Sequence, residues 1–231
     1  MAKIKFGAMM TDARGKLGGQ VFSKNRGGAY LRTKVTPVNP NSPAQAIVRN
    51  RLTQFSQGFR GLLQEEITAW NSAVQDFQST DIFGDLKKPT GLNLYVKLNA
   101  NIDQVSGVAI TVPPNISDSA NTPAVVTGAS ATVVGGGAVT VTYAPTPVPA
   151  DNAFVIYATR PLSAGKNFVK NEFREVFVRD EADISPIVIT TAYNAKFGAV
   201  ATGQKVVFRI IPINKLSGIQ GAPVEFSAIA S

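Results

Sequence analysis

The sequence predicts an α+β protein of several domains, in which a basic, glycine-rich β-hairpin arm and short helices precede an antiparallel β-sandwich. Three observations support this fold class. The apolar periodicity changes from 3.6 to 2 across residues 106–123. The 231 residues include 20 Gly and 14 Pro, a content that suits strands joined by turns better than a helical bundle. The positive charge is concentrated in the first 60 residues.

The same observations divide the chain into four segments. We expect a basic arm at residues 1–40, a small helical region at 41–105, a linker at 106–122 and the β-sandwich at 123–231. Pro, Ser and Asn crowd into the expected linker, as they do in exposed connections between domains.

The arm is rich in glycine and short of bulky core residues. Two alternating stretches, residues 20–23 and 29–35, flank a glycine turn at 25–28, which predicts a β-hairpin. A two-stranded ribbon alone is only marginally stable in water. We therefore expect the arm to become ordered on a partner or a neighbouring subunit, by adding strands to another sheet or by lying in a groove. The alternative is that it packs on the chain's own helices.

A stiff, proline-rich connection at residues 36–43 leads into the first expected helix. Ser42 is placed as the N-cap, with Pro43 at the first helical position and Gln45 completing a capping box. The apolar stripe that this helix is expected to bury comprises Val48, Leu52, Phe55, Phe59 and Leu62.

Two further helices are expected, one over residues 65–77 and one that follows an N-cap at Thr90. Spacing places four aromatic side chains of the helical region in its core rather than in a site: Phe55, Phe59, Trp70 and Tyr95.

Seven strand candidates follow the linker, a number and spacing typical of an antiparallel sandwich. They are residues 124–133, 137–144, 153–159, 173–179, 186–193, 204–211 and 223–229. The alternation of Val139, Val141 and Tyr143 with Thr140 and Thr142 predicts one buried and one outward face.

The charge distribution marks the candidate binding residues. Residues 1–60 hold eleven Lys and Arg against one acid, Asp12, and so carry +10, whereas residues 61–231 carry −2. The arm is therefore expected to bind an acidic protein surface, and direct contact with nucleic acid is the alternative. A third interpretation is that the charges are simply exposed to solvent and bind nothing. A glycine-rich arm needs backbone partners, and another sheet supplies these better than a duplex does. The candidate partner-binding residues are Arg14, Lys16, Lys24, Arg26, Tyr30, Arg32 and Lys34.

The composition argues against an enzyme. With no His and no Cys, the chain lacks an imidazole base, a thiolate and the usual zinc ligands, so we expect no catalytic residues, cofactor, metal or small-molecule substrate. Neither Lys16 nor Lys166 completes a phosphate-loop motif. The acids at residues 180–183 fit a solvated turn better than a calcium site. No segment has the length and apolarity of a membrane span or signal peptide, which predicts a soluble protein made in a cytoplasm.

Two parts of the sequence resemble known families. The run from Lys205 to Ser227 resembles the last two strands of fibronectin type III and other immunoglobulin-like modules, although Val206 and Phe208 stand where such modules often carry a tyrosine. Residues 14–75 look like a segment of structural proteins from tailed bacteriophages and prophages of Bacteroides-type hosts. The residues that carry this second resemblance are the basic glycine-rich run from Gly15 to Arg32, Pro37 to Pro40, Ala44, Gln45, Val48, Arg49 and Trp70.

The second resemblance implies a virion component, associated with the capsid or with head–tail or tail assembly. It would be made in the host bacterial cytoplasm and located in the virion. Its implied partners are other virion proteins and further copies of itself.

Overall fold

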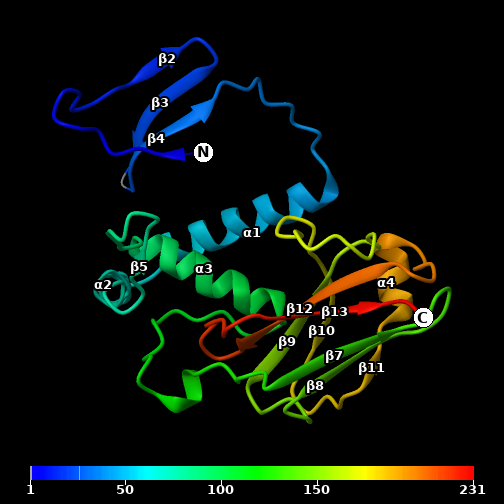
Figure 1. Ribbon diagram of the computed structural model, residues 1–231. Helices are drawn as coiled ribbons and strands as arrows, with labels where there is room; N and C mark the ends of the chain where they lie inside the picture. Colours follow the sequence, from blue (N-terminus) through cyan, green and yellow to red (C-terminus); the bar gives the residue numbers. More distant parts are fainter. Residues whose placement is uncertain (1, 26) are drawn as a thin grey trace. The chain divides into compact units, whose positions relative to one another are not determined.

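The structure is a computed structural model that describes residues 2–25 and 27–231. It has an α+β fold, with four α-helices and several antiparallel sheets in the described residues (Figure 1). The chain forms two compact units. The N-terminal unit comprises residues 1–50 and 78–88, and the C-terminal unit comprises residues 51–77 and 89–231. This division differs from the predicted boundaries, because residues 106–122 lie inside the C-terminal unit together with most of the helical region.

The N-terminal unit contains a four-stranded antiparallel sheet in the order β1-β4-β3-β2. Its strands are β1 (Ala2–Lys3), β2 (Gly15–Leu17), β3 (Gln20–Asn25) and β4 (Gly28–Thr33). The predicted hairpin is confirmed by the pairing of β3 with β4, in which Asn25 lies opposite Gly28. Gly28 has a φ of 101°, a backbone conformation that favours glycine. The expectation of a two-stranded ribbon was incomplete, because β1 and β2 extend the hairpin on both sides.

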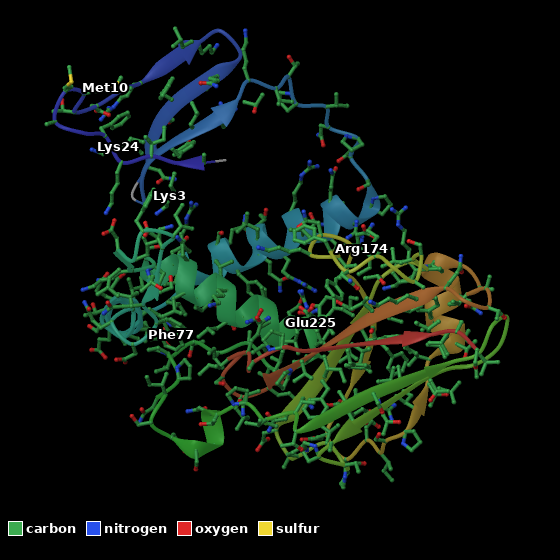
Figure 2. The ribbon with its side chains drawn as sticks, in the orientation of Figure 1. Lys3, Met10, Lys24, Phe77, Arg174 and Glu225 are labelled. Carbon is green, nitrogen blue, oxygen red and sulfur yellow. The ribbon has the colours of Figure 1, made fainter. Side chains whose placement is uncertain are left out.

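A second, smaller hairpin belongs to the same unit, formed by β5 (Ser79–Thr80) and β6 (Leu86–Lys87). The unit has almost no apolar core: of its described residues, only Val21 is buried. Few side chains surround its sheet, whereas side chains fill the space between the two larger sheets of the C-terminal unit (Figure 2).

Helix α1 (Pro43–Arg60) begins in the N-terminal unit and ends in the C-terminal unit. Its predicted cap is confirmed, since Ser42 Oγ accepts from the Gln45 amide at 3.4 Å and Gln45 Oε1 accepts from the Ser42 amide at 3.3 Å. The predicted apolar stripe is wrong over its first half. Val48 and Leu52 are 64% and 55% exposed, because only the C-terminal half of the helix packs into a core, around Phe55.

Helices α2 (Gln64–Ala73) and α3 (Gly91–Gln104) complete this core. Helix α2 ends at Ala73, four residues before the predicted end. Trp70 is fully buried, and its indole N–H donates to the Thr111 carbonyl at 2.6 Å. The Trp70 ring meets Tyr95 edge to face, with centroids 5.3 Å apart. The N-cap at Thr90 is confirmed by the bond from the Asn93 amide to its Oγ1, at 3.1 Å.

The remaining strands form two antiparallel sheets, β10-β9-β12-β13 and β11-β8-β7. Their bounds are β7 (Gly128–Val133), β8 (Val139–Ala144), β9 (Asn152–Ala158), β10 (Arg174–Arg179), β11 (Ile187–Val188), β12 (Lys205–Asn214) and β13 (Val224–Ile229). Each of the seven candidates thus contains a strand. The candidate at 186–193 is mostly wrong, because β11 spans two residues and α4 (Thr190–Phe197) follows it. This helix inserts Tyr193 into the core, where its hydroxyl donates to the Thr159 carbonyl at 2.9 Å.

The two sheets share one apolar core. Val139, Val141 and Tyr143 of β8 are buried, as the alternation predicts. They belong to the same cluster as Phe154 and Ile156 of β9 and Phe208 and Ile210 of β12. Burial of this apolar area is the main source of stability of the C-terminal unit.

Helix α3 is joined to the four-stranded sheet, which explains why the predicted linker is not a break. Gln104 donates to the Tyr157 hydroxyl at 2.7 Å and to Glu175 at 2.8 Å, and Val105 packs in a small cluster with residues of β9 and β12. Asn214 Nδ2 donates to the carbonyls of Ala120 and Thr122 at 2.8 and 3.3 Å. The segment at 106–122 is therefore held against the strands.

Candidate functional site

The net charge of the protein resides in the N-terminal unit. That unit contains eleven Lys and Arg and three Asp, so its formal charge of +8 equals that of the whole chain. The C-terminal unit contains twelve basic and twelve acidic residues and is neutral. The unit with almost no apolar core is thus also the unit that attracts anions.

Strand register brings several of the predicted binding residues onto one face of the N-terminal sheet. Residues directly opposite each other in antiparallel strands share a face. Lys16 lies opposite Val21, which lies opposite Arg32. Ser23 lies opposite Tyr30, which lies opposite Lys3.

The ladder continues beyond β4, where the Lys34 amide donates to the Gly19 carbonyl at 2.8 Å. Because side chains alternate along a strand, Lys34 shares the face of Arg32. We call this surface the cationic face; it comprises Lys3, Lys16, Tyr30, Arg32 and Lys34.

The other predicted residues are not part of the cationic face. Lys24 lies opposite Ala29, on the reverse face with Phe22 and Leu31. Arg14 precedes β2 and pairs with Asp12 at 3.1 Å. Arg26 lies outside the described residues. The predicted set is therefore divided between the two faces of the sheet and the adjoining loop.

The charges of the cationic face are largely uncompensated. The three acids of the unit already have partners: Asp12 pairs with Arg14, Asp81 with Lys3 at 2.5 Å and Asp85 with Lys5 at 2.9 Å. Within the described part of the chain, no carboxylate lies within 4 Å of Lys16, Arg32 or Lys34. These three side chains remain available to an external anion.

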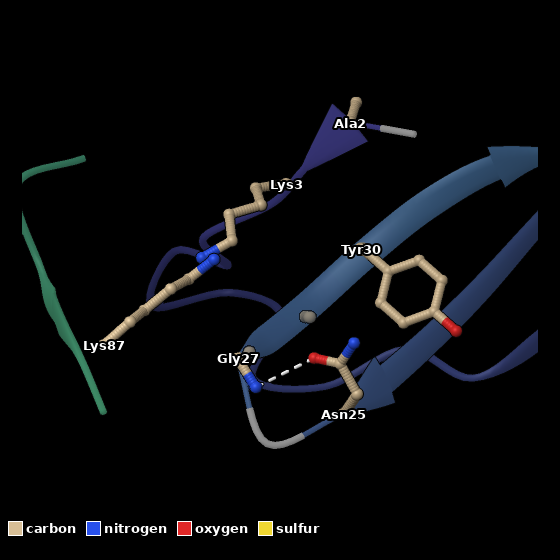
Figure 3. A pocket seen from close by; sticks show the side chains of 8 residues that line it. Ala2, Lys3, Asn25, Gly27, Tyr30 and Lys87 are labelled. Atoms are coloured by element: carbon tan, nitrogen blue, oxygen red, sulfur yellow. Dashed lines mark hydrogen bonds between the residues drawn. The ribbon is translucent and has the colours of Figure 1, made fainter. Parts of the chain in front are cut away.

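A pocket of about 250 Å³ lies beside this face. In Figure 3 the ammonium groups of Lys3 and Lys87 point toward each other. The Asp81 carboxylate raises the pKa of Lys3, and the Lys3 ammonium lowers the pKa of Lys87. The pocket is lined by Ala2, Lys3, Asn25, Gly27, Gly28, Ala29, Tyr30 and Lys87.

The predicted binding residues do not include Lys3, which belongs to the cationic face, or Lys5 and Lys87, which lie near it in the same unit. Lys3 meets Asp81 across 78 positions, and no local pattern indicates this association. In the sequence, the high density of basic residues in the N-terminal segment indicates a charged surface, but it does not indicate which acids pair with them.

The acidic turn of the C-terminal unit is held by ion pairs. Lys215 pairs with Asp180 at 2.7 Å and with Glu181 at 3.8 Å, and Arg179 pairs with Asp183 at 3.5 Å. Among the described residues, no group of three or more carboxylates is placed to hold a metal ion.

Comparison with known proteins found no matching family model, no similar curated protein and no similar solved structure. No helix in the described ranges has both the length and the apolarity needed to cross a bilayer. Function is therefore inferred from the charges, packing and geometry of the chain itself, together with the sequence resemblance of residues 14–75.

Proposed function

We propose that the protein is a non-enzymatic structural component of a bacteriophage virion. It attaches to other subunits through the N-terminal unit and α1 and exposes the two-sheet region as an immunoglobulin-like sandwich. The resemblance of residues 14–75 to structural proteins of tailed phages supports the virion assignment. The position within the particle is the capsid, the head–tail region or the tail.

One observation carries this proposal: the unit that holds the whole net charge buries a single described side chain, Val21. A small sheet normally needs a buried apolar face for independent stability. Large apolar side chains of this unit are instead exposed, among them Leu17, Val38, Ile47 and Leu86. Exposed apolar groups combined with uncompensated charge are typical of a surface that is covered in an assembly.

An acidic protein partner fits both faces of the sheet. The cationic face attracts carboxylates, while the reverse face presents Leu17, Phe22 and Leu31 to an apolar surface. A phosphate backbone satisfies only the cationic face. We therefore favour a protein partner, either another virion protein or a further copy of this chain.

The immunoglobulin-like assignment is supported by the strand count. Seven strands divide into antiparallel sheets of four and three around one core, as expected for this class of sandwich. Helix α4 and the short β11 are local departures from that arrangement.

Hydrogen exchange on isolated protein and on purified particles tests the proposal. In the isolated protein, amides of β3 and β4 are expected to exchange fast, whereas those of β9 and β12 are protected. In particles, where mass spectrometry should detect the chain, β3 and β4 become protected as well. Equal protection of residues 2–40 and β9 in dilute isolated protein contradicts assembly through the N-terminal unit.

Nucleic-acid binding is the second candidate, favoured because no carboxylate of the described residues forms an ion pair with Lys16, Arg32 or Lys34. It predicts tight DNA binding whose affinity falls steeply with salt, because bound counterions are released. It also predicts loss of binding when Lys16 and Arg32, both on the cationic face, are changed to Ala. Weak binding at physiological salt favours the structural role.

A further inference from the structure

A second pocket, of about 310 Å³, opens in the C-terminal unit. Three segments build it: the second residue after β9, the turn that leads into β10 together with the first residue of that strand, and the last residue of α4. Its lining consists of Arg160, Asn171, Glu172, Arg174 and Phe197. This pocket therefore combines guanidinium, carboxylate, amide and aromatic groups.

The pocket lies in a basic segment of a unit that is neutral as a whole. Residues 160–174 contain four basic side chains and one acid, Glu172. The Glu172 carboxylate accepts from Lys166 and, at 3.4 Å, from Arg160, and these cations lower its pKa. Glu172 is thus held in its ionised form, and the two neighbouring cations offset much of its charge.

Arg174 retains its charge and most of its donors. Its Nη1 donates to the carbonyls of Phe173 at 3.0 Å and Asn171 at 3.4 Å, which fixes the guanidinium beside the turn. No carboxylate of the described chain pairs with it. Since a guanidinium has five N–H donors, several remain for a ligand.

The walls of the pocket are anchored from behind. The Phe197 ring lies 5.1 Å from that of Tyr193, whose hydroxyl is bonded to Thr159, the residue before Arg160. On the other side, Val169 packs with Leu162, Val207 and Phe173 beneath the loop. Phe197 and the backbone of the loop are therefore positioned before any ligand binds, which lowers the entropic cost of binding.

We propose that this pocket binds an acidic saccharide. Arg174 matches a sugar carboxylate, because a planar guanidinium and a carboxylate form parallel hydrogen bonds. Glu172 and Asn171 are suited to hydroxyl groups, and the Phe197 ring offers an apolar surface to the C–H face of a sugar. The volume is at the lower end of ligand pockets. A phosphate-bearing ligand such as a nucleotide fits less well, because a phosphate dianion meets more repulsion from the Glu172 carboxylate than the single charge of a sugar carboxylate does.

The test is an NMR titration of the full chain with D-glucuronic acid, with D-glucose and AMP as comparison ligands. Glucuronic acid is expected to shift the amides of residues 171–174 and 198, and to bind at least about tenfold more tightly than glucose. Arg174→Gln should weaken glucuronic acid binding by about tenfold or more. Lys170→Gln is the matched control, because it removes the same charge from a neighbouring residue that does not line the pocket; it should change binding less than about twofold.

A second variant, Phe197→Leu, keeps an apolar side chain at position 197 and leaves the charge of the pocket unchanged, but removes the ring. It should weaken glucuronic acid binding several-fold. The proposal is overturned if glucuronic acid shifts none of these amides at tens of millimolar, if Lys170→Gln weakens binding as much as Arg174→Gln, or if AMP binds more tightly. Neither outcome of the virion experiment affects this result, since the pocket does not involve the N-terminal unit.

Discussion

Lys16 and Arg32 lie on the same face of the N-terminal sheet, one on each side of Val21. Val21 is the one buried side chain among the described residues of that unit. Two uncompensated cations thus flank the single buried side chain in the described part of this unit. The proposed binding surface therefore corresponds to one face of the sheet.

Charge removal can identify which face of the N-terminal sheet makes the proposed attachment to other subunits. Arg32→Gln is expected to reduce incorporation of the protein into particles several-fold, as loss of about 1 kcal/mol of binding free energy does. Lys24→Gln removes the same charge from the reverse face and should reduce incorporation less. Quantitative mass spectrometry of purified particles measures both. Equal losses would show that net charge alone determines attachment.

Asp81 provides a pH-dependent link between β1 and the β5–β6 hairpin. Its hydrogen bond from Lys3 lowers the pKa of the carboxyl from its ordinary 3.8 to about 2. Because the folded pKa is depressed, the stabilisation is fully present above pH 3.8 and is lost as the pH falls toward 2. A ¹³C titration of the Asp81 carboxyl should therefore show a midpoint near 2.

The control is the Lys3→Gln variant, in which the Asp81 midpoint should rise toward 3.8. Asp81→Asn should also speed hydrogen exchange of β5 and β6, whereas Asp85→Asn, at a more exposed pair, should have a smaller effect. An unchanged midpoint in Lys3→Gln would assign the low pKa to the backbone donors of Phe83 and Asp85 instead.

Features that depend on neighbouring residues were predictable from sequence. The caps at Ser42 and Thr90 need only a partner three residues away, and the burial of Val141 and Tyr143 follows from strict alternation. The concentration of positive charge near the N-terminus could also be predicted from the sequence. Which basic residues share a face was not, because that depends on strand register, and one residue of slip exchanges the two faces.

The features that the sequence did not predict depend on contacts between segments far apart in the chain. The pairing of Lys3 with Asp81 and the bonds from Asn214 to the predicted linker join residues far apart in sequence. The apolar stripe on α1 shows what periodicity can and cannot predict. It identifies the apolar face of a helix, but it does not say which other residues cover that face. Phe55 has partners on α2 and α3, whereas Val48 has none in the described chain that bury it.

Two leucine variants can test whether the first half of the α1 stripe is exposed. Leu98 on α3 is 1% exposed and Leu52 on α1 is 55% exposed. Leu98→Ala should lower the free energy of unfolding by about 2–5 kcal/mol, because it leaves a cavity. Leu52→Ala should change it by about 0.5 kcal/mol or less. Denaturant unfolding followed by the fluorescence of Trp70, the single tryptophan, measures both. A large loss for Leu52→Ala would mean that the first half of the stripe is buried.

Two glycines test whether α3 is packed on the strand region or merely tethered to it. Gly218 and Gly136 have similar positive φ values, 69° and 67°. A Cβ on Gly218 would lie 2.3 Å from the Leu98 carbonyl oxygen of α3, whereas nothing lies within 4 Å of one on Gly136. Gly136→Ala should therefore cost about 1 kcal/mol from backbone strain alone, and Gly218→Ala about 3 kcal/mol because overpacking is added. Similar losses in the two variants would mean that α3 moves away from residue 218 without cost. The helices and strands would then be separate domains, as the composition of residues 106–122 suggested.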